Sequence, residues 1–432
     1  MLPPDHPSRL ALADEVHARP PEPMTTPCSA TYIAVLIEPG NRARELAHIA
    51  ALCDHFQVPP PAADATHFGA QLGAIRFKWE RHGEFSGFTM LTPGLSPQPF
   101  SEPVVTLLPP GWLAALPGTT IVAAHAKLIP AATTQLDAAT LAALFEGNIA
   151  VGGAIGGGAG LAYTDFKIHA DGFVRLAVCN LSLTERQAGR TLQRLFEIEA
   201  YRMMALLALP IARRLAPRIA AIEASLTELT AHIAAEAGGD EALLQELTRL
   251  AAEIESCLSG SQFRFGACRA YHELVTTRIA ELRETRLPGI QTIQEFMARR
   301  LTPAVATCAT ASQRLHGLSD RVAQASALLS TRVDIARERQ NQALLASMDR
   351  RAKLQLRLQQ TVEGLSVAAI VYYVAGLIGY VAKAGKAGGF ALHPDLVVGL
   401  AIPLVAIAVI VALRRARRRI DRAEAAKDPE LE

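Results

Sequence analysis

Residues 365–382 read LSVAAIVYYVAGLIGYVA, and residues 396–413 read LVVGLAIPLVAIAVIVAL. Neither stretch carries a charged side chain, and each is about 18 residues long, which is the lower limit for a helix that spans a bilayer. The linker between them, KAGKAGGFALHPD, is rich in glycine and polar at its ends, as expected of a short turn outside the membrane. We therefore predict a C-terminal transmembrane hairpin over residues 365–413.

The positive charges around the two stretches predict their orientation. The connecting loop has only Lys383 and Lys386, whereas the flanks are rich in arginine. The flanking basic residues are Arg350, Arg351, Lys353, Arg357, Arg414, Arg415, Arg417, Arg418 and Arg419. Loops rich in lysine and arginine stay in the cytoplasm. We expect a two-span protein of the bacterial inner (cytoplasmic) membrane, with both termini in the cytoplasm.

Composition fits a mostly soluble chain with a membrane segment. The 432 residues are 50% hydrophobic, and the mean hydropathy is +0.19. The net charge of +2 gives no overall field to hold nucleic acid. The six cysteines form no Cys-x-x-Cys pair, so we expect neither a disulfide framework nor a thiolate zinc site. The N-terminal residues lack a basic start and an apolar run, which predicts no signal peptide.

Residues 1–182 have short apolar runs broken by proline and glycine, which predicts an α+β domain with a largely antiparallel sheet. Asp171-Gly172 marks a hairpin turn. Helices are expected over residues 41–55 and 137–145. Strands are expected over residues 31–38, 73–80, 85–91, 120–128, 162–169 and 173–181.

Residues 183–302 have apolar residues at a spacing of three and four, which predicts a helical hairpin or coiled coil. Thr184 is the expected cap of its first helix, Pro210 the end of that helix, and Gly238-Gly239 a later turn. Pro303 is expected to begin a long stalk helix over residues 303–364. If this helix continues to Lys383, its ~80 residues span about 120 Å. A basic cytoplasmic tail, residues 414–432, completes the chain.

Two polar clusters are candidates for binding a cation. One contains Asp14 and His17, together with neighbouring charged residues. In the other, Glu80, His82 and Glu84 occupy alternate positions and would share one face of a strand. Carboxylates and imidazole can share a divalent cation. The alternative is that the two segments pair with each other by salt bridges and dock the N-terminal segment.

No pattern indicates catalysis. The glycine-rich residues 152–160 lack the Gly-Lys-Ser/Thr of a phosphate loop and are expected to form a turn between strands. Glu199 and Arg202 are helical neighbours, for which we expect a structural ion pair. There is no Gly-x-Ser-x-Gly and no His-Glu-x-x-His. We expect a protein that is not an enzyme and has no cofactor.

Five segments together resemble one bacterial family of uncharacterised membrane-anchored proteins. They are DHPSRLALADEVHARPP, FKWERHGEFSGFT, TDFKIHADGF, RLFEIEAYRMMALLALP and RRAKLQLRLQQTVEGLSVAAIVYYVAGLIGY. The resemblance covers nearly the whole chain. It implies membrane anchoring, but it implies no activity and no site residues.

The order of elements is also similar to that of the CorA-type magnesium channels. The sequence AGLIGYV at residues 375–381 looks like the Ala-Gly-x-x-Gly-Met-Asn of that family, although Tyr380 and Val381 replace Met and Asn. This resemblance implies an oligomeric cation channel, with Ser366, Tyr373, Gly379 and Tyr380 lining the pore.

The favoured interpretation is a non-catalytic, membrane-anchored scaffold, and the alternative is a CorA-like channel. The expected partners are the lipid bilayer, an unidentified protein and further copies of the chain. Ala375 and Gly379 form a small-xxx-small pair, so the first span and the stalk are the expected contacts between copies.

The predicted orientation can be tested with reporter fusions. We expect a periplasm-active reporter to work when it is inserted at Gly388 and to be silent at Glu432, since positive charge holds both flanks inside. A cytoplasm-active reporter should give the reverse pattern. Periplasmic activity at Glu432 would refute the two-span arrangement.

Overall fold

The computed structural model describes residues 3–10, 12–13, 20–96, 100–131, 135–235, 239–387 and 393–425, with side chains as far as residue 416. The chain divides into two compact units, Met1–Leu329 and Ser330–Glu432. The first holds a sheet and a group of helices, and the second holds the apolar helices. The long helix α7 (Ile293–Ala387) contributes residues to both.

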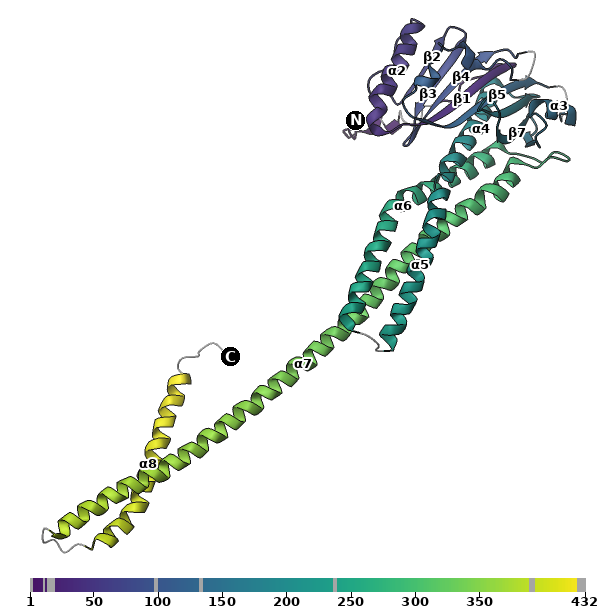
Figure 1. The fold of residues 1–432 in the computed structure, drawn as a ribbon. Coiled ribbons are helices and arrows are strands. Elements are labelled where there is room, and N and C mark those ends of the chain that lie inside the picture. The colour runs from purple at the N-terminus through teal and green to yellow at the C-terminus, as the bar shows by residue number, and fades with distance from the viewer. Residues whose placement is uncertain are drawn as a thin grey trace. The chain divides into compact units, whose positions relative to one another are not determined.

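The first unit contains an eight-stranded sheet with the strand order β2-β3-β4-β1-β5-β8-β7-β6 (Figure 1). All neighbours are antiparallel except β5 and β8, which are parallel. This confirms the predicted α+β domain. The strands are β1 (Cys28–Leu36), β2 (His67–Leu72), β3 (Ile75–Arg81), β4 (Phe85–Pro93), β5 (Thr119–Pro130), β6 (Val151–Ile155), β7 (Gly160–Ile168) and β8 (Val174–Asn180).

Strand β3 shows how the two faces of the sheet are divided. Ile75, Phe77 and Trp79 are buried beneath α2 (Arg42–His55) and the short helices η2 (Val104–Leu107) and η3 (Leu113–Ala115). The indole Nε1 of Trp79 donates to Glu45 Oε1 of α2 over 2.8 Å. Successive side chains of a strand alternate between faces, so the intervening polar residues of β3 lie on the face that carries α4 (Glu185–Leu206).

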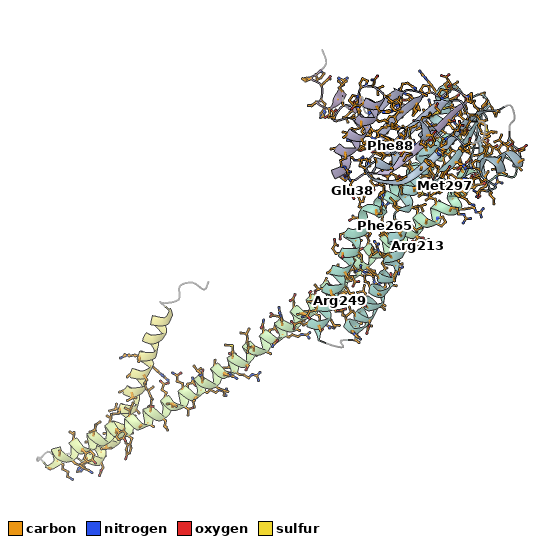
Figure 2. The ribbon with its side chains drawn as sticks, turned by 45° about the horizontal axis from the view of Figure 1, so that its top comes forward. Glu38, Phe88, Arg213, Arg249, Phe265 and Met297 are labelled. Atoms are coloured by element: carbon orange, nitrogen blue, oxygen red, sulfur yellow. The ribbon has the colours of Figure 1, made fainter. Side chains whose placement is uncertain are left out.

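The other end of the sheet has a smaller core on the α2 side. Tyr163 of β7 and Ala177 of β8 pack there with Phe145, which follows α3 (Ala138–Leu144). The largest cluster of buried apolar side chains among the described residues lies on the opposite face, against α4. It continues between the helices that follow the sheet. Figure 2 shows the side chains crowding the sheet around Phe88. The sheet is therefore covered on both faces.

The helices after the sheet pack on one another in the first unit. Helix α4 begins as predicted, with Thr184 and Gln187 forming a reciprocal capping box. Helix α4 ends at Leu206, close to the predicted end. Pro210 lies in the first turn of the next helix, α5 (Leu209–Ala234), where the N–H that proline lacks would have no bonding partner. Helix α6 (Asp240–Leu282) then returns along α4 and α5.

Pro303 does not begin the long helix, as the sequence had led us to expect. Helix α7 begins at Ile293, and Pro303 lies inside it. The actual start is a capping box in which Thr292 N donates to Glu295 Oε2 and Glu295 N donates to Thr292 Oγ1. Buried Ile293, Met297 and Leu301, spaced by four residues, hold this first part of α7 against the core.

The glycine-rich segment is structural. Residues 152 and 153 belong to β6, and the turn follows at residues 156–159. A Cβ on Gly152 would lie 2.0 Å from the carbonyl oxygen of Ala162. On the outer side of β6, isolated bridges join Val151 to Gln291 and Ala154 to Thr285. The loop between α6 and α7 therefore covers an edge strand that would otherwise have unpaired backbone groups.

In the second unit, α7 and α8 (Pro394–Ala425) are long and apolar enough to cross a membrane. Their apolar stretches are almost entirely exposed in the protein alone, with 11% and 0% of the residues buried. Ala375 and Ala382 are among the few buried side chains, and a Cβ on Gly379 would lie 3.0 Å from Val398 of α8. The small residues of α7 thus contact α8 of the same chain.

Substitution of Gly152 should destabilise the first unit, whereas substitution of Gly260 should not. Gly152→Ala places a methyl group against backbone, at a cost of about 2 kcal/mol or more. Gly260 lies inside α6 with nothing within 4 Å of an added Cβ, so Gly260→Ala should stabilise by about 0.5–1 kcal/mol. Thermal unfolding of the purified protein should show Tm changes of opposite sign. An unchanged Tm for Gly152→Ala would contradict the register of β6 and β7.

Candidate functional site

A small polar cavity lies between β3 and α4. It has a volume of about 30 Å³, which leaves room for little more than one water molecule. We call it the β3–α4 cavity. Its charged and polar lining residues come from the segment before β1, from β1, from β3 and the turn after it, from β4 and from α4; they are Glu22, Tyr32, Lys78, Glu80, His82, Thr89, Gln193 and Glu197.

Lys78 is the central cation of the cavity and is only 8% exposed. Its Nζ lies 3.0 Å from Glu80 Oε1 and donates to the carbonyl oxygen of Pro20 over 3.0 Å. A buried ammonium group is costly unless it is paired and hydrogen-bonded. Here the pairing is provided by the same strand and by the N-terminal segment.

The segment of residues 20–24 is fixed on both sides of the cavity. Glu22 accepts two hydrogen bonds from Arg76 of β3, at 3.0 and 2.9 Å. The amide of Met24 donates to the Glu185 carbonyl oxygen of α4. A Cβ on Gly189 would lie 1.8 Å from the carbonyl oxygen of Glu22, so only glycine allows this contact with α4. Residues 20–24 therefore form an ordered part of the cavity wall.

The helix side of the cavity is a further ion-pair network. Glu197 accepts from Arg278 of α6 and, over 2.8 Å, from Gln193 Nε2. Tyr32 stacks on Phe196, with ring centroids 4.9 Å apart. Burial, with smaller contributions from Tyr201, Glu80 and Glu197, raises the pKa of Tyr32 well above its usual value. The phenol therefore stays neutral at physiological pH.

Of the three residues predicted to share a cation around β3, Glu80 and His82 line the β3–α4 cavity and Glu84 does not. Glu80 pairs with Lys78, His82 stacks on Phe85 with centroids 4.4 Å apart, and Glu84 pairs with Arg264 of α6. Within the described ranges no group of three or more His, Cys, Asp or Glu residues is arranged to hold a metal ion. Asp14 and His17 lie outside the described residues, so their predicted role stays a prediction. The neighbouring residues 20–24 do dock on β3 by ion pairs.

The opposite face of the sheet carries buried bases that the sequence reasoning missed. The ring of His125 stacks on Phe173 at 3.8 Å, and its Nδ1 lies 2.8 Å from Thr31 Oγ1. Burial, the largest cause, lowers the pKa of His125 to about 4. Lys127 donates to Ser29 Oγ over 2.8 Å, and burial lowers its pKa too. The only signal was two basic residues on one face of the apolar run TIVAAHAKL.

A second histidine holds the turn between β7 and β8. His169 Nε2 lies 2.9 Å from Asp165 Oδ2, and Nδ1 lies 3.1 Å from Glu146 Oε2. Arg175 also donates to Glu146. Hydrogen bonds from His169 first, and then from Arg175, lower the pKa of Glu146. His169 lies between the two carboxylates, so the three groups do not converge on a common point.

The predicted pore-lining residues all lie in the second unit, but their surroundings differ from one residue to another. Ser366 Oγ donates to the Val362 carbonyl oxygen of its own helix. Tyr373 and Tyr380 are 69% and 75% exposed. Together with Gly379 they line an open cavity of about 760 Å³ between α7 and α8, near Lys383 and Asp395.

A family model described as "Protein of unknown function (DUF3422)" matches residues 4–420, which is nearly the whole chain and includes both the β3–α4 cavity and the apolar helices. The protein belongs to the DUF3422 family. No curated protein and no solved structure matches it. Family membership confirms the resemblance to an uncharacterised family, whereas the resemblance to CorA-type channels receives no support. The DUF3422 match assigns no activity to the cavity.

Replacing Gly189 should release the N-terminal segment from the cavity. In Gly189→Ala the new methyl group cannot coexist with the Glu22 carbonyl oxygen, so the Met24 amide should lose its bond to α4. We expect its hydrogen exchange to accelerate by roughly tenfold or more.

The matched variant for this experiment is Glu22→Gln, which keeps the backbone contact and weakens only the pair with Arg76. It should accelerate exchange at Met24 much less. Equal protection of Met24 in Gly189→Ala and the unsubstituted protein would show that the segment does not pack against α4.

Proposed function

We propose that this DUF3422 protein is a non-catalytic scaffold anchored in the bacterial inner membrane by two helices. Two features support the anchor. The apolar stretches of α7 and α8 are exposed in the protein alone, and lipid would cover them. The arginines at both flanks favour a cytoplasmic first unit.

An exposed apolar surface on α7, N-terminal to its apolar stretch, is the main support for the scaffold proposal. Large hydrophobic side chains lie exposed in this part of the helix, where water would otherwise contact them. At 100° per residue, five of these side chains fall within an arc of about 120°, whereas Leu354 and Leu358, which are also exposed, lie outside it. We call the five the α7 apolar surface: Leu344, Leu345, Met348, Leu356 and Val362. Surfaces of this kind mark contacts with another helix.

A second copy of the chain is the partner that we propose for this surface. The opposite side of the same helix carries Arg339 and Arg357, which suits solvent or an acidic surface but not a packed core. The small pair Ala375 and Gly379, which we had expected to join copies, contacts α8 of the same chain. Self-association therefore rests on the α7 apolar surface. An unidentified protein partner would then bind the first unit.

The alternative function is an oligomeric cation channel. One observation favours it, namely that Tyr373 and Tyr380 line the open cavity between α7 and α8. A pore would need these groups to face a shared axis between copies. Cation flux into proteoliposomes that changes on Tyr380→Ala would favour the channel over the scaffold, and absence of flux from a confirmed oligomer would exclude the channel.

Photo-crosslinking distinguishes the possible partners of the α7 apolar surface. A crosslinking amino acid at Leu344, Leu345 or Met348 should yield a covalent dimer of the chain in cell membranes, because apolar side chains on this arc are buried between copies. The same residue at Arg339 or Arg357, on the opposite side of the helix, should yield little or none. Equal yields at both sets of positions, or no protein adduct at all, would contradict the proposal.

A further inference from the structure

Two cysteines from different helices lie in contact inside the first unit. Cys268 of α6 and Cys308 of α7 are 1% and 2% exposed, line the same small cavity, and lie close enough for each thiol to shift the pKa of the other. Both are free thiols. The other four cysteines lie elsewhere, in β1, α2, β8 and three turns earlier in α6. Neither thiol of the pair belongs to the β3–α4 cavity.

The small cavity gives access to the pair. It has a volume of about 80 Å³ and is lined by both cysteines, by Phe265 and Val305, and by the polar Arg269 and Gln313. Phe265 marks its place on α6 in Figure 2. The volume exceeds that of a water molecule severalfold. A small hydroperoxide therefore fits beside the sulfur atoms, whereas a bulky thiol such as glutathione does not.

The surroundings make one thiol the better nucleophile. A hydrogen bond from Cys308 is the largest cause of a lowered pKa at Cys268, and Arg264 and Arg269 add to the effect. The same hydrogen bond raises the pKa of Cys308. Thiolates, not thiols, react with peroxide. Because Arg269 also lines the cavity beside the pair, we take Cys268 as the attacking group and Cys308 as the resolving group.

We propose that Cys268 and Cys308 are a redox site at which hydrogen peroxide drives formation of a disulfide between α6 and α7. The Cys268 thiolate attacks one peroxide oxygen and the O–O bond breaks, which gives a sulfenic acid and, after protonation, one water molecule. The Cys308 sulfur then attacks the Cys268 sulfur, and the hydroxyl group leaves as a second water molecule. Two thiols are oxidised and one peroxide is reduced. Dithiol reductants reverse the reaction.

The disulfide would close the chain around the loop that covers β6. The residues between the two cysteines include Thr285 and Gln291, which bridge to that strand. A cross-link between helices limits the freedom of the unfolded chain. Oxidation should therefore raise the Tm of the protein, by about 5 °C, and slow hydrogen exchange in the covering loop.

The test is mass spectrometry of the full-length protein in detergent, first reduced and then treated with hydrogen peroxide. Trypsin should release residues 265–269 disulfide-linked to residues 301–314, with a mass two hydrogens below the sum of the two peptides. Dithiothreitol should abolish the linked species. The Tm of the same samples should rise on oxidation and return on reduction.

Cys257→Ser is the matched control, because it removes a buried α6 cysteine outside the pair and should leave the linked peptides unchanged. Cys308→Ser should abolish the link and leave Cys268 as sulfenic or sulfinic acid. If that variant fails to fold, the presence or absence of the linked peptides in the unsubstituted protein still tests the proposal. Peroxide treatment that yields no linked peptides, or that takes Cys268 to sulfinic acid while Cys308 stays reduced, would overturn the proposal.

Discussion

The packing of α4 on the sheet is the contact on which the first unit depends. Its buried face, which includes Leu192, Leu195 and Phe196, covers the central strands, and its other side contacts α6. The helix also provides Gly189, against which the N-terminal segment lies, and Glu197, which closes the polar cavity. Removing this contact would expose the largest apolar cluster among the described residues and would also open the β3–α4 cavity.

Charge is buried at this contact, and pairing makes that possible. Lys78 and Glu80 on the strand form a nearly buried pair, whereas the pairs Arg76–Glu22 and Arg278–Glu197 at its margin are partly exposed. Buried pairs of this kind add little stability compared with apolar packing, but an unmatched partner would be costly. Their effect is to fix which surfaces meet. We therefore interpret the ion pairs around the cavity as structural: they determine how the N-terminal segment, the sheet and α4 pack together.

The sequence predicted the strands with clear apolar runs and failed where the signal came from distant contacts. Strand β6 was interpreted as a turn because Gly152 and Gly153 lower strand propensity, and their need for close approach becomes visible only in the structure. The start of α7 was wrongly predicted at Pro303. The correct signal was the capping pair Thr292 and Glu295, which precedes it in the sequence. For the candidate site, the motif around β3 identified Glu80 and His82, which line the cavity, but not Lys78. It could not show that Glu84 turns away to Arg264, because that partner lies 180 residues later.

The covered edge of β6 has a consequence for synthesis on the ribosome. Strand β6 ends at Ile155, whereas the bridges to its outer side come from Thr285 and Gln291, roughly 130 residues later. At typical rates of about 5–20 residues per second, that interval lasts on the order of ten seconds. During this time an unpaired strand edge is available to neighbouring chains. The nascent protein therefore passes through a stage in which its own fold does not yet cover this edge.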